Sequence, residues 1–372
     1  MNTIAPKFID TDVHVRWEDD NIIAEHLSAA WKERWLTGAG HTQAGLRINP
    51  KFYNPREPLG HEAPKTVGRQ GVTNANALMN GWMMPNDIDA ALVSVYDAPN
   101  LSTFGDIDYP VEVARAVNDW LIENWLEKSP AIYGTIVVAT QDPECAAKEI
   151  RRAAKHERML QVMLPTGSMF PYGNRRFFPI YQAAEECGLV ITIHSGTEGM
   201  GTSPAPTPCG WPSTLSELRV TRLTTFLGHL TSMITEGVFV RFPGLRVVGL
   251  EVGIAWLSTY LWRFDKNYKG LRSECPWLRE LPSEYTRRYF RFGTQGAEPG
   301  EPASEFWRLL GSNKLDEILM FSSNYPRWDH DTPASSFVMS SAPSDKIEAL
   351  QTGTAHATYP RLRWQLKPSV SW

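Results

Sequence analysis

Short, continuously apolar runs alternate with amphipathic segments along most of the chain. The apolar runs predict β-strands at residues 8–15, 90–96, 133–138, 160–165, 189–194, 245–251, 289–294 and 318–324. Between them, apolar positions that recur every three or four residues predict helices at 111–128, 143–156, 175–188, 223–237, 253–268 and 303–311. Strands that are apolar throughout and separated by helices indicate a parallel sheet.

Eight such strands favour a closed α/β barrel, the (β/α)8 or TIM-barrel fold, over an open sheet. A doubly wound sheet is the alternative, but no GxGxxG turn follows the first predicted strand. One barrel with insertions can account for 372 residues, so we expect a single domain over residues 1–372. Two loop-like stretches, 38–88 and 196–213, interrupt the alternation, and we expect them to form lids or active-site loops.

Charge and cysteine content narrow the class of protein. A net charge of −4 provides no broad basic surface for nucleic acid. There is no apolar run of membrane length, and the start MNTIAPKFID does not read as a signal peptide. The four cysteines form no CxxC pair, which argues against a thiolate metal site and a disulfide framework and favours a reducing, cytoplasmic location.

Metal-capable side chains stand at or near the ends of several predicted strands. The set is Asp12, His14, His194, His229, Glu251 and Asn324. Asp12 and His14 are two residues apart in the first strand, so both side chains point to one face. Because barrel sites form at the carboxyl ends of the strands, we expect the six side chains to converge on bound metal.

Each of these residues also has a purely structural explanation. A histidine at a strand end is more often a hydrogen-bonding core residue than a ligand, and Glu251 could cap the helix that begins near Gly253. The set as a whole is more informative, because two carboxylates buried together without a cation repel each other. Imidazole and oxygen ligands without thiolate suit iron, manganese or zinc, and the residues do not choose among them.

Several segments resemble the amidohydrolase-related proteins that include aminocarboxymuconate-semialdehyde decarboxylase. They are IDTDVHV, LVITIHSG, FPGLRVVGLEVGIAWL, RRYFRFGTQGAEP and FSSNYPRWD. The resemblance implies a metal-bearing TIM barrel with ligands from the first strand, His194 and residue 324. A hydrolase of this type carries an aspartate at the end of strand eight, which holds the metal and takes a proton from water. Asn324 keeps an oxygen that can coordinate but lacks the charge and the basicity.

With Asn324, the set also resembles a TIM-barrel branch of non-haem di-iron monooxygenases, that of platensimycin and platencin biosynthesis. This resemblance implies an oxidoreductase with two iron ions that uses O2 and an unidentified electron donor. Its substrate would be a hydrophobic, diterpenoid-type acyl group linked to CoA, in antibiotic biosynthesis. Glu251, His229 and Asn324 would be catalytic as well as metal ligands. We take this reading as the main prediction.

Two other readings stay open. The first is a mononuclear zinc or manganese hydrolase or decarboxylase, in which His229 or Glu251 handles protons. The second is a binding module whose chemistry has decayed, which the retained metal-capable set disfavours. By analogy with family members we also expect a homodimer.

Further residues are candidates for the substrate side of the site. The Met- and Trp-containing segment 77–85 would suit an apolar lid, and three tryptophans could line a pocket: Trp211, Trp256 and Trp328. Ordinary packing explains them equally well. Four arginines are candidates for phosphate contacts with CoA: Arg16, Arg47, Arg69 and Arg327.

Overall fold

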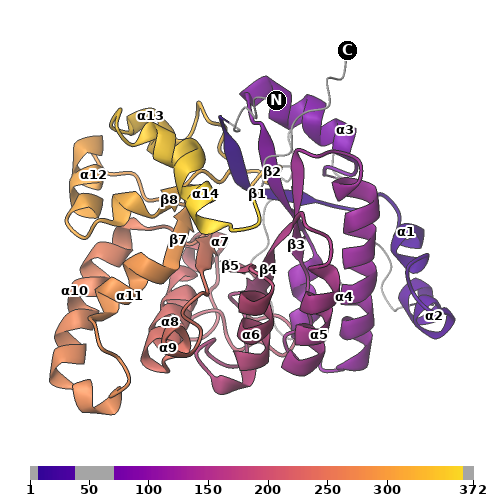
Figure 1. The fold of residues 1–372 in the computed structure, drawn as a ribbon, viewed down its shortest axis with the longest axis horizontal. Coiled ribbons are helices and arrows are strands. Elements are labelled where there is room, and N and C mark those ends of the chain that lie inside the picture. Colours follow the sequence, from indigo (N-terminus) through magenta and orange to yellow (C-terminus); the bar gives the residue numbers. More distant parts are fainter. Residues whose placement is uncertain (1–6, 38–70, 363–372) are drawn as a thin grey trace.

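The computed structural model describes residues 7–37 and 71–362. Within them, eight parallel strands form one sheet in the order β1 to β8, surrounded by helices (Figure 1). The strands are β1 (Ile9–Val15), β2 (Ala90–Val95), β3 (Ile132–Ile136), β4 (Met159–Pro165), β5 (Val190–His194), β6 (Val247–Leu250), β7 (Phe290–Gly293) and β8 (Leu319–Met320). Each predicted strand is found close to its expected position, because a continuous apolar run buried on both faces suits a parallel sheet.

Backbone hydrogen bonds join the last strand to the first. Beyond Met320 the chain continues along β1, and the Thr11 N–H donates to the Phe321 carbonyl (3.1 Å). Further along, the Asn324 N–H donates to the Asp12 carbonyl (3.0 Å), and the His14 N–H donates to the Tyr325 carbonyl (2.7 Å). The sheet is therefore a nearly closed barrel, and the TIM-barrel prediction is confirmed.

The longer helices lie between successive strands, as expected. They are α4 (Asp108–Leu121), α5 (Pro143–Ala153), α6 (Phe178–Glu186), α8 (Leu223–Thr235), α10 (Ala255–Gly270) and α12 (Ala303–Gly311). The sequence pattern missed the other helices, all but α2 of eight residues or fewer. They are α1 (Asp20–Ala24), α2 (Ala29–Thr37), α3 (Ala75–Leu78), α7 (Leu215–Thr221), α9 (Val238–Arg241), α11 (Pro282–Tyr289), α13 (Phe337–Ser341) and α14 (Thr354–Thr358). Helices of so few turns carry too little periodicity to detect.

A bulge in β1 turns two candidate ligands into the barrel. The register between β1 and β2 shifts by one residue between Asp10 and Val13. Because side chains alternate between the two faces of a strand, an extra residue reverses which positions face inward. Ile9 packs inside the barrel, whereas Val13 packs against the surrounding helices. Asp12 and His14 consequently point into the barrel.

The chain after β8 closes the end of the barrel opposite the metal-capable residues. Ala355, Tyr359 and Leu362 belong to the same buried cluster as inward-facing residues of the strands, such as Ile9 and Leu92. The Tyr359 hydroxyl donates to Oε1 of Gln161 on β4 (2.8 Å). This cluster, which we call the barrel floor, fills the lumen beneath the site.

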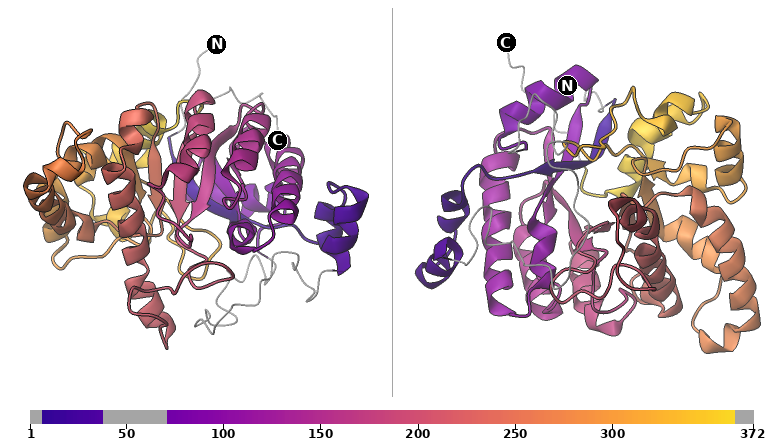
Figure 2. Two further views of the ribbon diagram at one scale, coloured as in Figure 1. Left: turned by 90° about the horizontal axis from the view of Figure 1, so that it is seen from below. Right: turned by 180° about the vertical axis from the view of Figure 1, so that it is seen from behind.

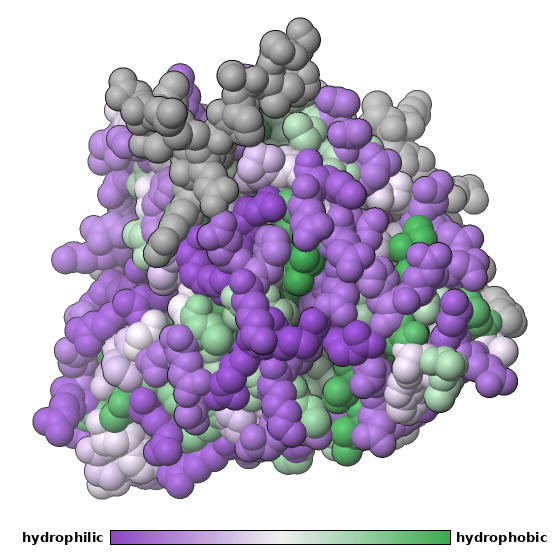
Figure 3. Space-filling view, turned by 45° about the vertical axis from the view of Figure 1, so that its right-hand side comes forward, coloured by the Kyte–Doolittle hydropathy of each residue, from purple (hydrophilic) through white to green (hydrophobic). Residues whose placement is uncertain are grey.

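Additional helices extend the body on two sides. Helices α1 and α2 project at one edge, and α10 to α12 lie at the opposite edge (Figure 2). On the face drawn in Figure 3, hydrophobic residues form small separate patches among hydrophilic ones. Among the described residues, no helix is both long and apolar enough to cross a membrane.

The structure describes only part of the first loop-like stretch and all of the second. Of segment 38–88, residues 38–70 lie outside the described part of the chain, and Arg47 and Arg69 lie there too. In the described remainder, Trp82 is buried, stacks on Tyr325 with ring centroids 4.1 Å apart, and donates to Oδ2 of Asp10 (3.0 Å). Residues 196–213 connect β5 to α7. A lid role for either stretch stays a prediction.

Candidate metal and active site

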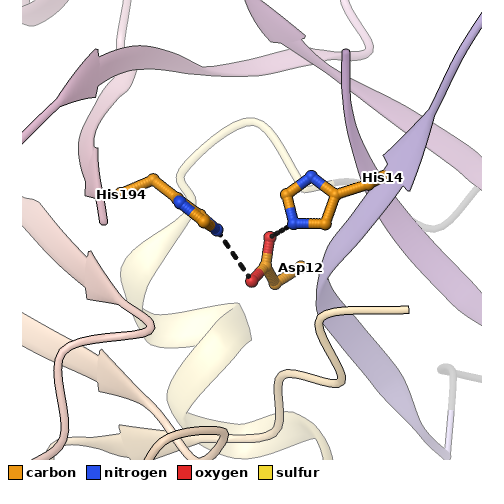
Figure 4. Close-up of side chains that lie close together, drawn as sticks. All are labelled: Asp12, His14 and His194. Carbon is orange, nitrogen blue, oxygen red and sulfur yellow. Dashed lines mark ion pairs between the residues drawn. The ribbon is translucent and has the colours of Figure 1, made fainter. Parts of the chain in front are cut away.

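Three buried side chains from two strands face one another inside the barrel (Figure 4). Asp12 and His14 come from β1, and His194 is the last residue of β5. Nε2 of His14 lies 3.5 Å from Oδ1 of Asp12, and Nε2 of His194 lies 3.4 Å from Oδ2 of Asp12. One ligand atom from each residue can be chosen so that all three lie within 4.8 Å of one another. We call these three residues the ligand group.

The hydrogen bonding of the ligand group fits a bound cation. Both carboxylate oxygens of Asp12 and Nε2 of His194 are buried and have no hydrogen-bond partner among the described residues. Nδ1 of His194 lies 2.7 Å from the Ser195 carbonyl, to which only a protonated nitrogen can donate. This bond leaves the lone pair of Nε2 directed at the centre of the group, as in metal-binding histidines. Oxygen and nitrogen donors of this kind suit a divalent manganese or zinc ion.

The two histidines of the ligand group have different electrostatic environments. Burial lowers the pKa of His14 to about 4, although the Asp12 carboxylate acts in the opposite direction. Burial has the largest single effect on the pKa of His194 and lowers it, but Asp12, Glu251 and the Ser195 carbonyl together raise it, so the net shift is upward. A neutral His14 has a lone pair to offer a metal at neutral pH.

Asn324 lies between the ligand group and Glu251. Its Oδ1 lies 2.8 Å from Nε2 of His14, and its Nδ2 donates to Oε1 of Glu251 (3.3 Å). Asn324 and Glu251 both have left-handed backbone conformations, with φ of 61° and 57°. Non-glycine residues in this region are uncommon and concentrate at functional sites. The structure thus brings Asn324 next to the ligand group and places Glu251 one side chain farther away.

Three arginines, Arg219, Arg222 and Arg327, surround Glu251, and we call them the arginine cluster. Their nitrogens lie 3.6, 3.8 and 4.0 Å from the Glu251 carboxylate, in that order. Burial raises the pKa of Glu251, but Arg327 and Arg222, followed by His194 and Arg219, lower it to about 2. Glu251 is therefore ionised at neutral pH.

His229 does not join the ligand group. It lies on α8, where its Nδ1 accepts from the Tyr172 N–H (3.1 Å) and its Nε2–H donates to the Thr166 carbonyl (2.8 Å). The imidazole also stacks on the Tyr172 ring, with centroids 4.2 Å apart. Backbone groups occupy both nitrogens, so His229 links α8 to the end of β4. His229 is thus a hydrogen-bonding core residue, which was the structural alternative to a metal ligand.

The arginines and tryptophans that were candidates for substrate contacts have different surroundings. Tyr96 contacts His14 edge-on at 5.7 Å, and Arg16 and Arg327 lie over the Tyr96 ring at 3.7 and 5.2 Å. Trp328 is half-exposed and lies beneath Arg219, at 5.2 Å. Trp211 is also half-exposed, whereas Trp256 packs against Phe226 and donates to the Val252 carbonyl.

A cavity of about 320 Å³ opens beside Glu251. Its lining includes Ser195, Arg219, Val220, Arg222, Glu251 and Glu298. Because Ser195 follows His194 and Glu251 contacts Asn324, the cavity adjoins the ligand group. Cavities of this size hold small organic ligands.

The sequence reading missed Arg219, Arg222 and Glu198. The two arginines are three residues apart in SELRVTR, a spacing that puts both on one side of a helical turn. That signal was available, but α7 itself was not predicted. Glu198 accepts from the Thr166 hydroxyl and lies 3.6 Å from Nε of Arg222. Nothing in its sequence context marks Glu198 as part of the site.

Comparisons with known proteins agree on family and fold. The family model described as amidohydrolase matches residues 9–361. A gamma-resorcylate decarboxylase from Rhodococcus jostii is 23% identical over 256 residues, which are 66% of this chain and 75% of that relative.

Solved structures give the same picture. The 5-carboxyvanillate decarboxylase from Novosphingobium aromaticivorans, with manganese and 4-hydroxy-3-methoxy-5-nitrobenzoic acid, is 19% identical with a TM-score of 0.69 over 96% of each chain. A dihydroxybenzoic acid decarboxylase from Polaromonas sp., with manganese and 2-nitroresorcinol, is 16% identical with a TM-score of 0.64, covering 96% of this chain and 97% of that one. At these identities the likeness shows a shared fold.

The prediction of a di-iron monooxygenase is wrong. The matched relatives are named as decarboxylases of aromatic acids, not as oxygenases of acyl-CoA substrates. The resemblance to the platensimycin and platencin enzymes is therefore not supported. The predictions that followed from it, namely the use of O2, an electron donor and a role in antibiotic biosynthesis, are wrong as well. The physical reason lies in the ligand group, since within the described residues it contains one carboxylate and two imidazoles. Two irons are commonly held by several carboxylates, and here arginines engage Glu251 instead.

Proposed function

Because the chain belongs to the amidohydrolase family, we propose that it is a metal-dependent decarboxylase of a small aromatic carboxylic acid. The observation that carries the proposal is the buried ligand group, whose Asp12 oxygens and His194 Nε2 lack other partners among the described residues. Several relatives with this fold are named as decarboxylases of such acids, and two of these decarboxylases have bound manganese. One manganese ion is the first choice for the metal and zinc the second.

We assign the metal to four side chains. Asp12, His14 and His194 supply one carboxylate and two imidazoles, and Oδ1 of Asn324 is the nearest additional oxygen, beside His14. A divalent ion held there would bind oxygen atoms of the substrate and stabilise negative charge on them. Asn324 adds no charge, so the ion and Asp12 together keep a net charge of +1 that attracts an anionic acid.

The arginine cluster prepares the cavity for an anion. Without these arginines, the ionised Glu251 would repel a carboxylate that enters beside it. Arg219 also pairs with Asp329, which removes a second negative charge from the entrance. The substrate can therefore approach the ligand group without facing an uncompensated carboxylate.

Decarboxylation of an aromatic acid breaks the bond between the ring and the carboxylate, forms a C–H bond and releases CO2, so it consumes one proton. The Asn324 amide cannot supply this proton, and both nitrogens of His229 are engaged by backbone groups. Glu251 lies between the cavity and Asn324, and its buried Oε2 has no hydrogen-bond partner among the described residues. We therefore assign to Oε2 of Glu251 the role of passing a proton from water to the ring. A cytoplasmic location and a homodimer remain predictions.

The proposal predicts CO2 release and a metal requirement. Protein loaded with manganese should release CO2 from 2,6-dihydroxybenzoate or 5-carboxyvanillate, measured by coupled assay, with about one manganese per chain by elemental analysis. His194→Ala should lose the metal and the activity. The same change at the exposed His356 is the matched control and should affect neither. Full manganese content in His194→Ala would refute the ligand assignment, and a metal-loaded wild type that releases no CO2 from any aromatic acid would refute the activity.

A further inference from the structure

We propose that Asp10 is a positioning residue for the metal site, and that it holds Asp12 and Asn324 at the spacing that one ion requires. This inference rests on the proposed function, which assigns both residues to the metal. Asp10 is not part of the ligand group. Its Oδ2 faces Trp82, which belongs to the buried cluster that packs between the strands and the surrounding helices.

Asp10 is a buried carboxylate that is held by three hydrogen-bond donors. Its Oδ1 accepts from the N–H groups of Asp12 (3.2 Å) and Ser323 (3.0 Å), and its Oδ2 accepts from the indole N–H of Trp82 (3.0 Å). No positively charged side chain in the described part of the chain pairs with it. Burying a carboxylate is costly unless hydrogen bonds compensate, so these three donors keep Asp10 in one place.

One oxygen of Asp10 joins the two segments that carry metal ligands. Asp12 lies in the bulge of β1, and Ser323 directly precedes Asn324. The Asp12 carbonyl in turn accepts from the Ser323 hydroxyl (3.1 Å) and from the Asn324 N–H (3.0 Å). Residues 323 and 324 are therefore fixed against β1 where the barrel closes.

The other oxygen of Asp10 acts on the residue that follows Asn324. Trp82, which donates to Oδ2, also stacks on the Tyr325 ring, with centroids 4.1 Å apart. Both aromatic side chains are buried. Asp10 thus holds the residues on both sides of Asn324, because it binds Ser323 directly and reaches Tyr325 through Trp82.

Asn324 needs this support because its backbone conformation is unfavourable. Its φ of 61° lies in a region that residues with a β-carbon seldom occupy, unless the surrounding structure imposes it. Its Oδ1 lies 2.8 Å from Nε2 of His14, and Oδ1 of Asp12 lies 3.5 Å from the same nitrogen. Distances from a metal ion to its ligands vary by only about 0.2 Å, so a small shift of Asn324 relative to Asp12 weakens the site.

Manganese titration followed by electron paramagnetic resonance, with thermal unfolding of the same samples, tests the inference. Asp10→Asn keeps the shape of the side chain but turns an NH2 group toward either the Trp82 N–H or the two backbone N–H groups. Its Kd for manganese should rise about tenfold or more, as when outer partners of metal ligands are lost. Ser258→Ala is the matched control, because it removes a buried hydrogen bond between α10 and α12, from the Ser258 hydroxyl to the Leu309 carbonyl (3.0 Å). The control should lower stability and leave the Kd unchanged.

A double variant separates positioning from a general loss of stability. Trp82→Phe keeps an aromatic ring to stack on Tyr325 and removes the N–H that opposes the new NH2 group. Asp10→Asn combined with Trp82→Phe should therefore bind manganese more tightly than Asp10→Asn alone. Its stability should not recover, because a smaller ring leaves space in a packed region. A residue that contributed only stability would give the opposite order of affinities.

The outcomes separate this inference from the proposed function. Equal Kd values for the wild type and Asp10→Asn, or a double variant that binds no more tightly than Asp10→Asn, would overturn the role of Asp10. If Asp10→Asn does not fold, Trp82→Phe alone decides, since it leaves Oδ2 of Asp10 without its donor: a raised Kd supports the role and an unchanged Kd rejects it. A wild type that binds no manganese would reject the metal site together with the proposed function. Manganese binding that depends on Asp10, without CO2 release from any aromatic acid, would support the positioning role and reject only the decarboxylase.

Discussion

At the scale of single residues, the backbone at Asn324 and Glu251 indicates that their positions matter. Left-handed φ costs a residue with a β-carbon about 1 kcal/mol, and asparagine tolerates it better than glutamate does. These two residues contact each other at the carboxyl ends of β8 and β6. The conformation directs both side chains toward the ligand group and the cavity, so the strain is compensated by the tertiary contacts that place them.

His229 provides a test of its structural role through pH. Burial lowers its pKa to about 4 in the folded chain, below the ordinary value of 6.5. As pH falls from 6.5 toward 4, the unfolded chain binds a proton that the folded chain does not, so the free energy of unfolding decreases. This residue alone should remove about 2 kcal/mol between pH 7 and pH 5. His229→Gln should show a correspondingly smaller pH dependence in urea unfolding, and an unchanged dependence would contradict the buried, neutral state.

At the scale of elements, close backbone contacts hold the site-bearing helices against the barrel. The chain after β4 packs on α8 at Gly173, where a Cβ atom would lie 2.1 Å from the Ser232 carbonyl oxygen. Because that neighbour is backbone, the clash cannot be relieved by a side-chain rotation. The absence of a side chain at Gly173 therefore lets α8 approach closely enough for His229 to reach the chain after β4.

Gly173→Ala should lower the free energy of unfolding by about 2 kcal/mol or more, because helix and loop must separate. Gly81→Ala is the matched control, since a Cβ atom at that exposed glycine meets nothing within 4 Å. The control should be neutral or slightly stabilising, as alanine favours helical backbone over glycine. Chemical denaturation of both variants at one pH gives the comparison, and equal stability of the two would argue against close packing at Gly173.

At the scale of the whole molecule, the C-terminal segment completes the barrel. Tyr359 is buried in the barrel floor and donates to Gln161, which also accepts from the Thr192 hydroxyl (2.5 Å). This network lies in the lumen beneath Asp12, whose charge raises the pKa of Tyr359 further after burial has raised it. The last described helix and the ligand group are thus parts of one packed interior.

Tyr359→Ala should destabilise the fold by about 3–5 kcal/mol, because a buried aromatic side chain leaves a cavity in the floor. Tyr359→Phe should cost only about 1 kcal/mol, since it removes one hydrogen bond and keeps the ring. Thermal unfolding of the metal-free protein measures both. If Tyr359→Ala unfolds at the wild-type temperature, the segment after β8 is not an integral part of the barrel.

The sequence was informative wherever a property depends on neighbours along the chain. Apolar runs located the eight strands, and the spacing of Asp12 and His14 placed both on one face of β1. The position of His194 at the end of an apolar run marked it as a candidate ligand. The predictions of the strands and of side-chain direction hold because strand formation and side-chain alternation are local consequences of the order of residues.

Other features depend on the tertiary structure alone. The surroundings of the imidazole separate His194, whose Nε2 faces Asp12, from His229, whose two nitrogens meet backbone groups. The residues beside each histidine in the chain do not decide between these surroundings. The bulge in β1, which points Asp12 inward, exists only in the pairing with β2. The arginines that hold Glu251 come from α7, from the residue between α7 and α8, and from the chain after β8, so their joint effect needs the closed barrel. Local order determined the strands and the donors, and packing between distant segments determined which donors meet.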